Sequence, residues 1–129
     1  MQTYDRLVLV VLHVSDLEAS LNVYRDVFRV PLALSEHDPP DDPWVGGQHA
    51  ALSWHDGAYL HFALYPARPP GRPVTTGAQV GFLVPSALEI HSRAVSSGVE
   101  VLHEPRPEPW GLTGRYLDPD QNIINVTSR

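Results

Sequence analysis

The chain has 129 residues, no cysteine and a formal net charge of −6. All nine of its basic residues are arginine, scattered through an acidic background. The composition therefore excludes a lysine Schiff base, a thiolate metal site and a disulfide framework, and it argues against nucleic-acid binding. With 43% hydrophobic residues, this length predicts one folded domain whose partner is a small molecule.

The first apolar run, Leu7–Leu12, is too short to span a membrane. It also lacks the positive flank and the small-residue cleavage site of a signal peptide. We interpret Leu7–Val14 as a buried strand and expect a cytoplasmic protein with no membrane partner.

A helix is predicted after this strand, because Ser15-Asp16-Leu17-Glu18 has the pattern of a capping box. Its apolar residues recur at three- and four-residue spacing up to Phe28, and Pro31 requires the helix to end before it. Asp56-Gly57 is a two-residue hairpin signal further along. The three strands predicted in this half are Pro31–Ser35, Gln48–His55 and Ala58–Tyr65.

The second half repeats this order. Val80–Val84 is a predicted strand, Ser86-Ala87-Leu88-Glu89 is a second capping box, and Gly98 is a natural end for the helix. The strands predicted after it are Val99–His103, Leu112–Leu117 and Asn122–Ser128, with a turn over residues 118–121.

Both halves thus read β-α-β-β-β, which predicts an α+β domain of two modules, residues 1–65 and 77–129, with residues 66–76 as linker. One such module buries little surface alone, so we expect the two to pair. The alternative is an unrelated α+β domain that contains two capped helices.

Three segments resemble the vicinal oxygen chelate superfamily, which includes glyoxalase I, bleomycin resistance proteins and extradiol dioxygenases. These segments are His13–Ser20, Tyr24–Phe28 and Gly114–Ile124. The resemblance implies two paired βαβββ modules that form a curved mixed sheet around a cup-shaped cavity. It does not define the activity, because members of the superfamily hydrolyse, isomerise, oxidise or only sequester their ligands.

One residue departs from the resemblance. Gln121 stands where the family usually has glycine, and a side chain in left-handed backbone costs on the order of 1 kcal/mol. We therefore expect the turn to differ locally.

Strand alternation separates two faces. One face is wholly apolar in the first strand and suits packing under helices, whereas the other carries uncharged polar and aromatic residues together with Arg115. Such a face suits a concave ligand pocket, and the alternative is an interface with another subunit. The predicted ligand-binding residues on it are His13, His49, Tyr59, His61, Gln79, Thr113, Arg115 and Asn125.

Metal binding is not expected. The resemblance places the ligands of metal-using relatives at Leu9, His61, Gln79 and Asn125, of which only His61 is a good ligand. A second metal hypothesis is a three-histidine site made of His13, His49 and His61. Without a metal, acid–base chemistry would rest on His61 or His13, supported by Tyr59 or Arg115.

Two long loops complete the predicted site. Glu36–Gly47 carries Trp44 and Glu104–Gly111 carries Trp110. Each tryptophan either closes over a planar ligand or pins its loop to the body of the protein. The acidic residues of the first loop, Asp38, Asp41 and Asp42, would favour a cationic ligand.

The leading hypothesis is a metal-independent small-molecule-binding protein of the glyoxalase/bleomycin-resistance type. It would be a homodimer that sequesters an aromatic or cationic ligand and uses no cofactor. The first alternative is a divalent-metal lyase, isomerase or dioxygenase of the same superfamily, with His61 and Gln79 among the ligands. The second is a partner-binding or regulatory domain whose cup is vestigial.

Overall fold

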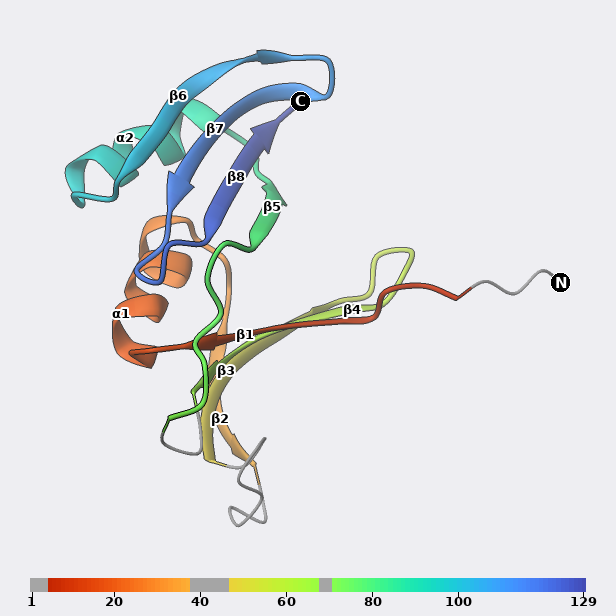
Figure 1. Ribbon diagram of the computed structural model, residues 1–129. Helices are drawn as coiled ribbons and strands as arrows, with labels where there is room; N and C mark the ends of the chain where they lie inside the picture. Colours follow the sequence, from red (N-terminus) through yellow and green to blue (C-terminus); the bar gives the residue numbers. More distant parts are fainter. Residues whose placement is uncertain (1–4, 38–46, 68–70) are drawn as a thin grey trace, which may run out of the picture. The chain divides into compact units, whose positions relative to one another are not determined.

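A computed structural model describes residues 5–37, 47–67 and 71–129 (Figure 1). Strands and helices follow in the order β-α-β-β-β twice, as predicted, so the α+β class and the two-module fold are confirmed. The elements are β1 Leu9–Val14, α1 Leu17–Leu21, η1 Asn22–Val27, β2 Ala33–His37, β3 Gly47–Trp54, β4 Leu60–Pro66, β5 Gln79–Leu83, α2 Ala87–Ser96, β6 Val101–Glu108, β7 Gly111–Leu117 and β8 Ile123–Ser128.

The strands form two mixed four-stranded sheets of matching topology. The first has the order β1-β4-β3-β2 and the second has the order β5-β8-β7-β6. In each sheet the first strand of the module runs parallel to the last, and the remaining pairs are antiparallel. The predicted β3–β4 and β7–β8 hairpins are present. The β3–β4 pairing ends at Trp54 and Leu60, so residues 55–59 form a longer loop in place of the predicted two-residue turn.

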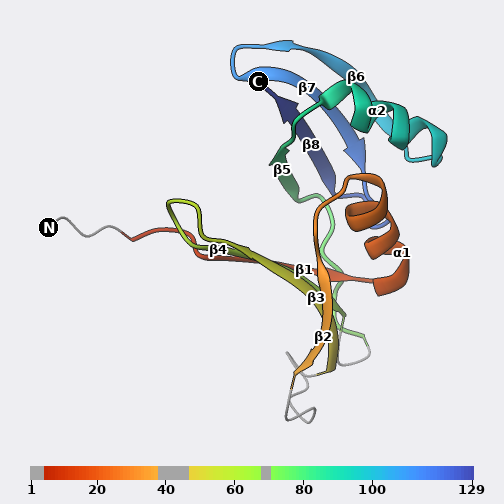
Figure 2. The same cartoon turned by 180° about the vertical axis from the view of Figure 1, so that it is seen from behind.

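The chain divides into two compact units. The first consists of Met1–Leu17 and Pro31–Val74, as far as these ranges are described, and the second consists of Glu18–Val30 and Thr75–Arg129. The second sheet therefore shares its unit with α2 and with most of the helix of the first module. Figure 2 shows α2 lying across this sheet.

Aromatic packing explains why the first helix joins the second sheet. The Tyr24 ring lies 6.3 Å from the Phe82 ring, and the Phe28 ring lies 5.2 Å from the Tyr116 ring, measured between centroids. The Tyr24 hydroxyl donates a buried hydrogen bond of 2.7 Å to Asp118 Oδ2 in the β7–β8 turn. Burial and the Asp118 carboxylate raise the pKa of Tyr24 far above its usual value.

The predicted ends of the second helix are confirmed. Ser86 Oγ accepts a hydrogen bond of 3.1 Å from the Glu89 N–H. Gly98 has a φ of 76°, and the Val99 N–H bonds back to the Ala94 carbonyl, as in a Schellman motif.

The first helix changes type along its length. It is α-helical over Leu17–Leu21 and continues as a π-helix over Asn22–Val27, in which the Phe28 N–H bonds to the Val23 carbonyl at 3.0 Å. It ends before Pro31, as predicted, with Arg29 at a φ of 61°.

Strand β6 corrects the prediction of a long loop over Glu104–Gly111. The strand runs to Glu108 through Pro105 and Pro107, and only the turn at Pro109 and Trp110 separates it from β7. Proline is tolerated because β6 is the edge of its sheet and its pairing shifts register on both sides of His103.

Gln121 is left-handed, with a φ of 68°. The backbone at this position therefore keeps the left-handed conformation that suits the usual glycine, and the expected local change of the turn is not seen there. Gln121 adopts this conformation although it carries a side chain.

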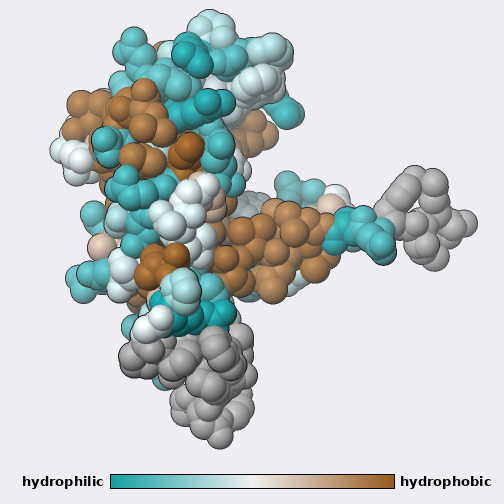
Figure 3. Space-filling view, in the orientation of Figure 1, coloured by the Kyte–Doolittle hydropathy of each residue, from teal (hydrophilic) through white to brown (hydrophobic). Residues whose placement is uncertain are grey.

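The surface of the first unit is apolar along β1. Leu7, Val8 and Leu9 are all exposed, and Figure 3 shows apolar residues gathered over this strand. Within the described residues, no helix is both long and apolar enough to cross a membrane.

Candidate functional site

The predicted polar face of the first sheet is arranged in rows across its strands. Strand alternation and register place the side chains of each row on the same side of the sheet. The outer rows carry histidine, tyrosine and serine, and alanines dominate the row between them. The rows are His13–Tyr65–His49–Ser35, Val11–Ala63–Ala51–Ala33 and Leu9–His61–Ser53.

His49 is the most constrained residue of the first row. Its ring stacks on Tyr65 with centroids 4.6 Å apart and an interplanar angle of 6°. Its Nδ1 donates to the Gly47 carbonyl at 3.3 Å, and its Nε2 shares a 3.1 Å hydrogen bond with the Ser35 hydroxyl. These contacts hold the His49 ring in place against the Tyr65 ring.

His13 lies on the other side of Tyr65, with ring centroids 6.5 Å apart. Burial, and secondarily the positive charge of Arg72, lower the pKa of His13. Burial also raises the pKa of Tyr65. His13 and Tyr65 therefore both favour the uncharged form at neutral pH.

His61 occupies the third row, where its Nδ1 shares a 2.7 Å hydrogen bond with Ser53 Oγ. Its orienting partner is thus a hydroxyl group. Tyr59 precedes β4, is 40% exposed and lies 5.2 Å from the His55 ring. The alanine row between His61 and His49 leaves a shallow apolar strip between two polar edges.

The corresponding face of the second sheet also has a polar central row, made of Gly81, Asn125, Arg115 and His103. Arg115 Nε donates to Asn125 Oδ1 at 2.7 Å, and Asn125 Nδ2 donates to Gln79 Oε1 at 3.3 Å. Three of the predicted residues are thereby joined in one hydrogen-bonded chain.

Thr113 and Thr127 form the next row toward the β6–β7 turn, and their hydroxyl oxygens lie 2.8 Å apart. A cavity of about 190 Å³ adjoins Thr127. Its walls include Gly81, Leu83 and Thr127 from this face, and Trp110 from the turn. Trp110 is 52% exposed, so its indole is available to a ligand.

His103 is a site residue that the sequence analysis missed. It is opposite Arg115 in the register, and its Nδ1 donates to the Glu104 carbonyl at 2.9 Å. Its Nε2 is buried and has no hydrogen-bond partner. Alternation could not place it, because the register shift between Val101 and His103 breaks the period of two.

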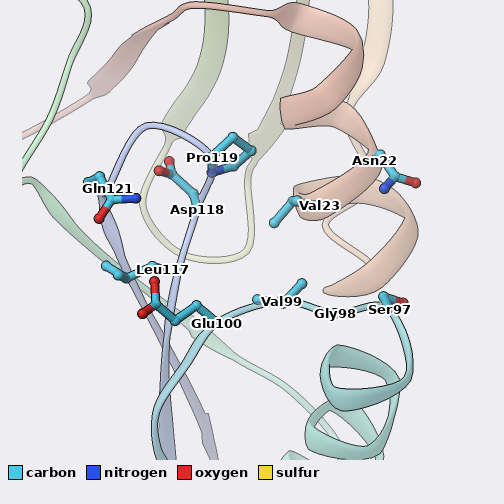
Figure 4. A pocket seen from close by; sticks show the side chains of 10 residues that line it. All are labelled: Asn22, Val23, Ser97, Gly98, Val99, Glu100, Leu117, Asp118, Pro119 and Gln121. Carbon is cyan, nitrogen blue, oxygen red and sulfur yellow. The ribbon is translucent and has the colours of Figure 1, made fainter.

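A second cavity, of about 260 Å³, lies outside the predicted site (Figure 4). It is bounded by η1, the end of α2 and the β7–β8 turn, and its polar side chains include Asn22, Glu100 and Gln121. The Asp118 carboxylate beside it is already bonded to Tyr24 and Asn122. Its residues match none of the predicted ligand-binding positions.

The four positions that the resemblance assigns to metal ligands do not suit a metal ion in this chain. In the first sheet Leu9, which has no donor atom, is paired with His61. In the second sheet Asn125 Oδ1 accepts from the Arg115 guanidinium, whose positive charge opposes a divalent cation at that oxygen.

The three histidines of the second metal hypothesis are also separated. The Tyr65 ring lies beside both His13 and His49, whereas His61 belongs to another row. Among the residues that the structure describes, no group of three or more histidine, aspartate or glutamate side chains could hold a metal ion.

Trp44, together with Asp38, Asp41 and Asp42, lies outside the described residues. Of the other predicted residues, His13, His49, Tyr59 and His61 belong to the first unit. Gln79, Trp110, Thr113, Arg115 and Asn125 belong to the second.

The sequence and the fold of this chain are similar to those of known proteins. Residues 6–126 match the family described as the Glyoxalase/Bleomycin resistance protein/Dioxygenase superfamily. No curated protein sequence matches significantly.

Several solved structures are similar along nearly the whole chain. TnmS3, an antibiotic binding protein from Streptomyces sp. CB03234, is 22% identical, with a TM-score of 0.69 over 99% of this chain and 98% of its own. A glyoxalase/bleomycin resistance protein from the same organism is 23% identical, with a TM-score of 0.65 over 95% and 99%. A member of the superfamily from Sphaerobacter thermophilus DSM 20745 is 21% identical, with a TM-score of 0.66 over 98% of both chains. These similarities show the fold.

Proposed function

Because the chain belongs to the glyoxalase/bleomycin resistance protein/dioxygenase superfamily, we propose that it is a metal-independent protein that binds and sequesters an aromatic small molecule. The observation that carries the proposal is the chemistry of the two polar faces. Their described residues provide aromatic rings, hydroxyl and amide groups and the Arg115 guanidinium, the few polar groups by which ligand pockets orient a ligand. The antibiotic-binding activity named for TnmS3 supports the same kind of function.

An aromatic ligand suits the described side chains. The stacked His49 and Tyr65 rings are largely buried and form an aromatic pair beside the alanine row, and Trp110, which is 52% exposed, borders the cavity of the second unit. Rings of this kind bind planar ligands by offset stacking. The proposal that the ligand is cationic rests on Asp38, Asp41 and Asp42, which lie outside the described residues.

Ligand titration tests the proposal. A panel of planar aromatic antibiotics, with cationic, neutral and anionic members, is titrated into the purified protein while tryptophan fluorescence and thermal stability are followed. We expect at least one member to quench the fluorescence and raise the melting temperature. Failure of the whole panel in both measurements would reject sequestration of such compounds.

Two neighbouring variants on β3 locate the site. His49→Ala removes the stacked ring, and we expect it to raise the Kd of the bound compound about tenfold, which corresponds to about 1.4 kcal/mol. Gln48→Ala alters the adjacent, exposed residue on the opposite face of the strand and should leave the Kd unchanged. Equal effects of the two variants would place the ligand elsewhere.

The metal-dependent alternative has a separate test. The pairs Leu9–His61 and Gln79–Asn125 do not provide a divalent site, so we expect substoichiometric metal in protein purified without chelator. We also expect zinc, nickel, iron and manganese ions to leave the melting temperature unchanged. A stoichiometric metal, lost together with stability in His61→Ala, would establish the alternative.

A further inference from the structure

Arg115 is a half-buried cation with no carboxylate beside it. In the part of the chain that the structure describes, the ion pairs are Arg25–Asp26, Arg29–Glu89 and Arg106–Glu108. Glu108, a carboxylate on the same face of the sheet, is paired with Arg106. A partly desolvated charge without a counter-ion is costly, and an incoming anion would relieve that cost.

Hydrogen bonding also orients the Arg115 guanidinium. Its Nε is bonded to Asn125 Oδ1, and the Asn125 amide is fixed in turn by Gln79. The two terminal Nη groups make no hydrogen bond to the described residues. They form the planar fork of donors that matches the two oxygens of a carboxylate or phosphate group.

An aromatic binding surface lies within reach of this fork. The cavity beside Trp110 includes Gly81, which belongs to the same row as Arg115, and Thr127 from the next row. Neighbouring rows on one face of a sheet are about 7 Å apart. A ligand of two rings that lies in this cavity against Thr127 can therefore still place an acidic group at Arg115.

We infer that the second sheet binds an aromatic acid, with its oxyanion on the Nη groups of Arg115 and its ring in the cavity beside Trp110. This rests on the proposed small-molecule function and names the ligand class for this face. A cationic ligand is disfavoured there because it would meet the guanidinium charge at close range.

Four probes that share one ring system test the inference by isothermal titration calorimetry. They are 2-naphthoate, 2-naphthyl phosphate, the neutral 2-naphthamide and the cationic 2-naphthylmethylammonium. We expect one or both anions to bind at least tenfold more tightly than the amide, and the cation to bind most weakly. A preference between the anions distinguishes a carboxylate from a phosphate ligand.

Variants assign the preference to Arg115. Arg115→Gln should weaken anion binding about tenfold and leave the amide unaffected. Asn125→Asp keeps the oxygen that Arg115 Nε contacts and supplies an internal counter-ion, so it should remove the preference while the fork itself remains. Arg25→Gln removes an exposed, ion-paired arginine from the helix and should change no Kd. Circular dichroism checks that each variant is folded.

The outcomes separate this inference from the proposed function. Equal binding of anion and amide, tighter binding of the cation, or an unchanged preference in both Arg115→Gln and Asn125→Asp would overturn the oxyanion site and leave small-molecule binding standing. Failure of all four probes would overturn the oxyanion site, whereas the proposed function would fall only if the antibiotic panel also failed.

Discussion

Gln121 holds a backbone conformation that suits glycine better than any residue with a side chain. Its φ of 68° places it in the left-handed region, and the Asp118 carboxylate fixes the turn around it by accepting the N–H groups of Asp120 and Asn122. We expect Gln121→Gly to raise the free energy of unfolding by about 0.5–1 kcal/mol, measured by urea denaturation.

The neighbouring residue provides the control for this prediction. Asp120 does not have a positive φ, so Asp120→Gly should lower the free energy of unfolding by adding flexibility to the unfolded chain. A loss of stability in Gln121→Gly would show that the Gln121 side chain contributes more than its backbone strain costs.

His13 makes stability depend on pH. Because burial and Arg72 lower its pKa in the folded protein, the unfolded chain takes up a proton at higher pH than the folded chain does. The free energy of unfolding should therefore be unaffected by this residue above the ordinary histidine pKa of about 6.5. It should fall as the pH decreases through that value toward the lower folded pKa.

His13→Gln isolates this contribution. We expect the variant to lose less stability than the natural protein between pH 7.5 and pH 5.5 in urea denaturation, because glutamine does not titrate. Parallel pH profiles for the two proteins would mean that His13 titrates alike in the folded and unfolded states.

The centre of strand β7 requires a glycine, Gly114, because there is no room for a side chain. A Cβ atom at Gly114 would lie 2.6 Å from the hydroxyl oxygen of Tyr116, whose ring is fully buried and whose hydroxyl group is hydrogen bonded to His91. We expect Gly114→Ala to lower the free energy of unfolding by about 1–3 kcal/mol through overpacking, measured by urea denaturation.

Gly81→Ala is the matched control on the other face of the same sheet. There the added Cβ would meet Asn125 Cβ at 3.7 Å, an ordinary contact, so the change should stay within about 0.5 kcal/mol. Similar losses in both variants would attribute the effect to strand propensity and not to the Tyr116 contact.

At the scale of the whole molecule, we expect two chains to associate through β1. It is an edge strand of the first sheet, and its first residue, Leu9, is exposed, as are Leu7 and Val8 just before it. Figure 3 shows apolar residues gathered over this strand. Apolar edge strands favour pairing with another chain. We expect sedimentation to give twice the chain mass of 14.3 kDa, which is the predicted homodimer, and we expect Leu9→Lys to shift it toward the monomer.

Leu88→Lys tests whether any exposed leucine has the same effect. Leu88 is 62% exposed on α2, in the second unit, and its replacement should leave the mass unchanged. If the natural protein sediments as a monomer at every concentration, the predicted homodimer is rejected.

Local patterns in the sequence were sufficient for the order of elements and for the face of the sheet on which regular strand residues lie. Capping at Ser86 and Gly98 is satisfied within a few residues of chain, and alternation along a regular strand assigns Arg115 and Asn125 to one face without reference to the rest of the protein. These features depend on neighbours in the chain, so the sequence determined them.

Only the tertiary structure decided features that depend on distant partners. A local pattern could not show that Tyr24 pairs with Asp118 and so joins its helix to the second sheet, or that β6 tolerates two prolines because it is an edge. The register shift that faces His103 toward Arg115 arises in the same way, from pairing with β7. The spacing of apolar residues along an element shows which side of that element is buried. Which residues of other elements pack against that side is decided only when the chain folds.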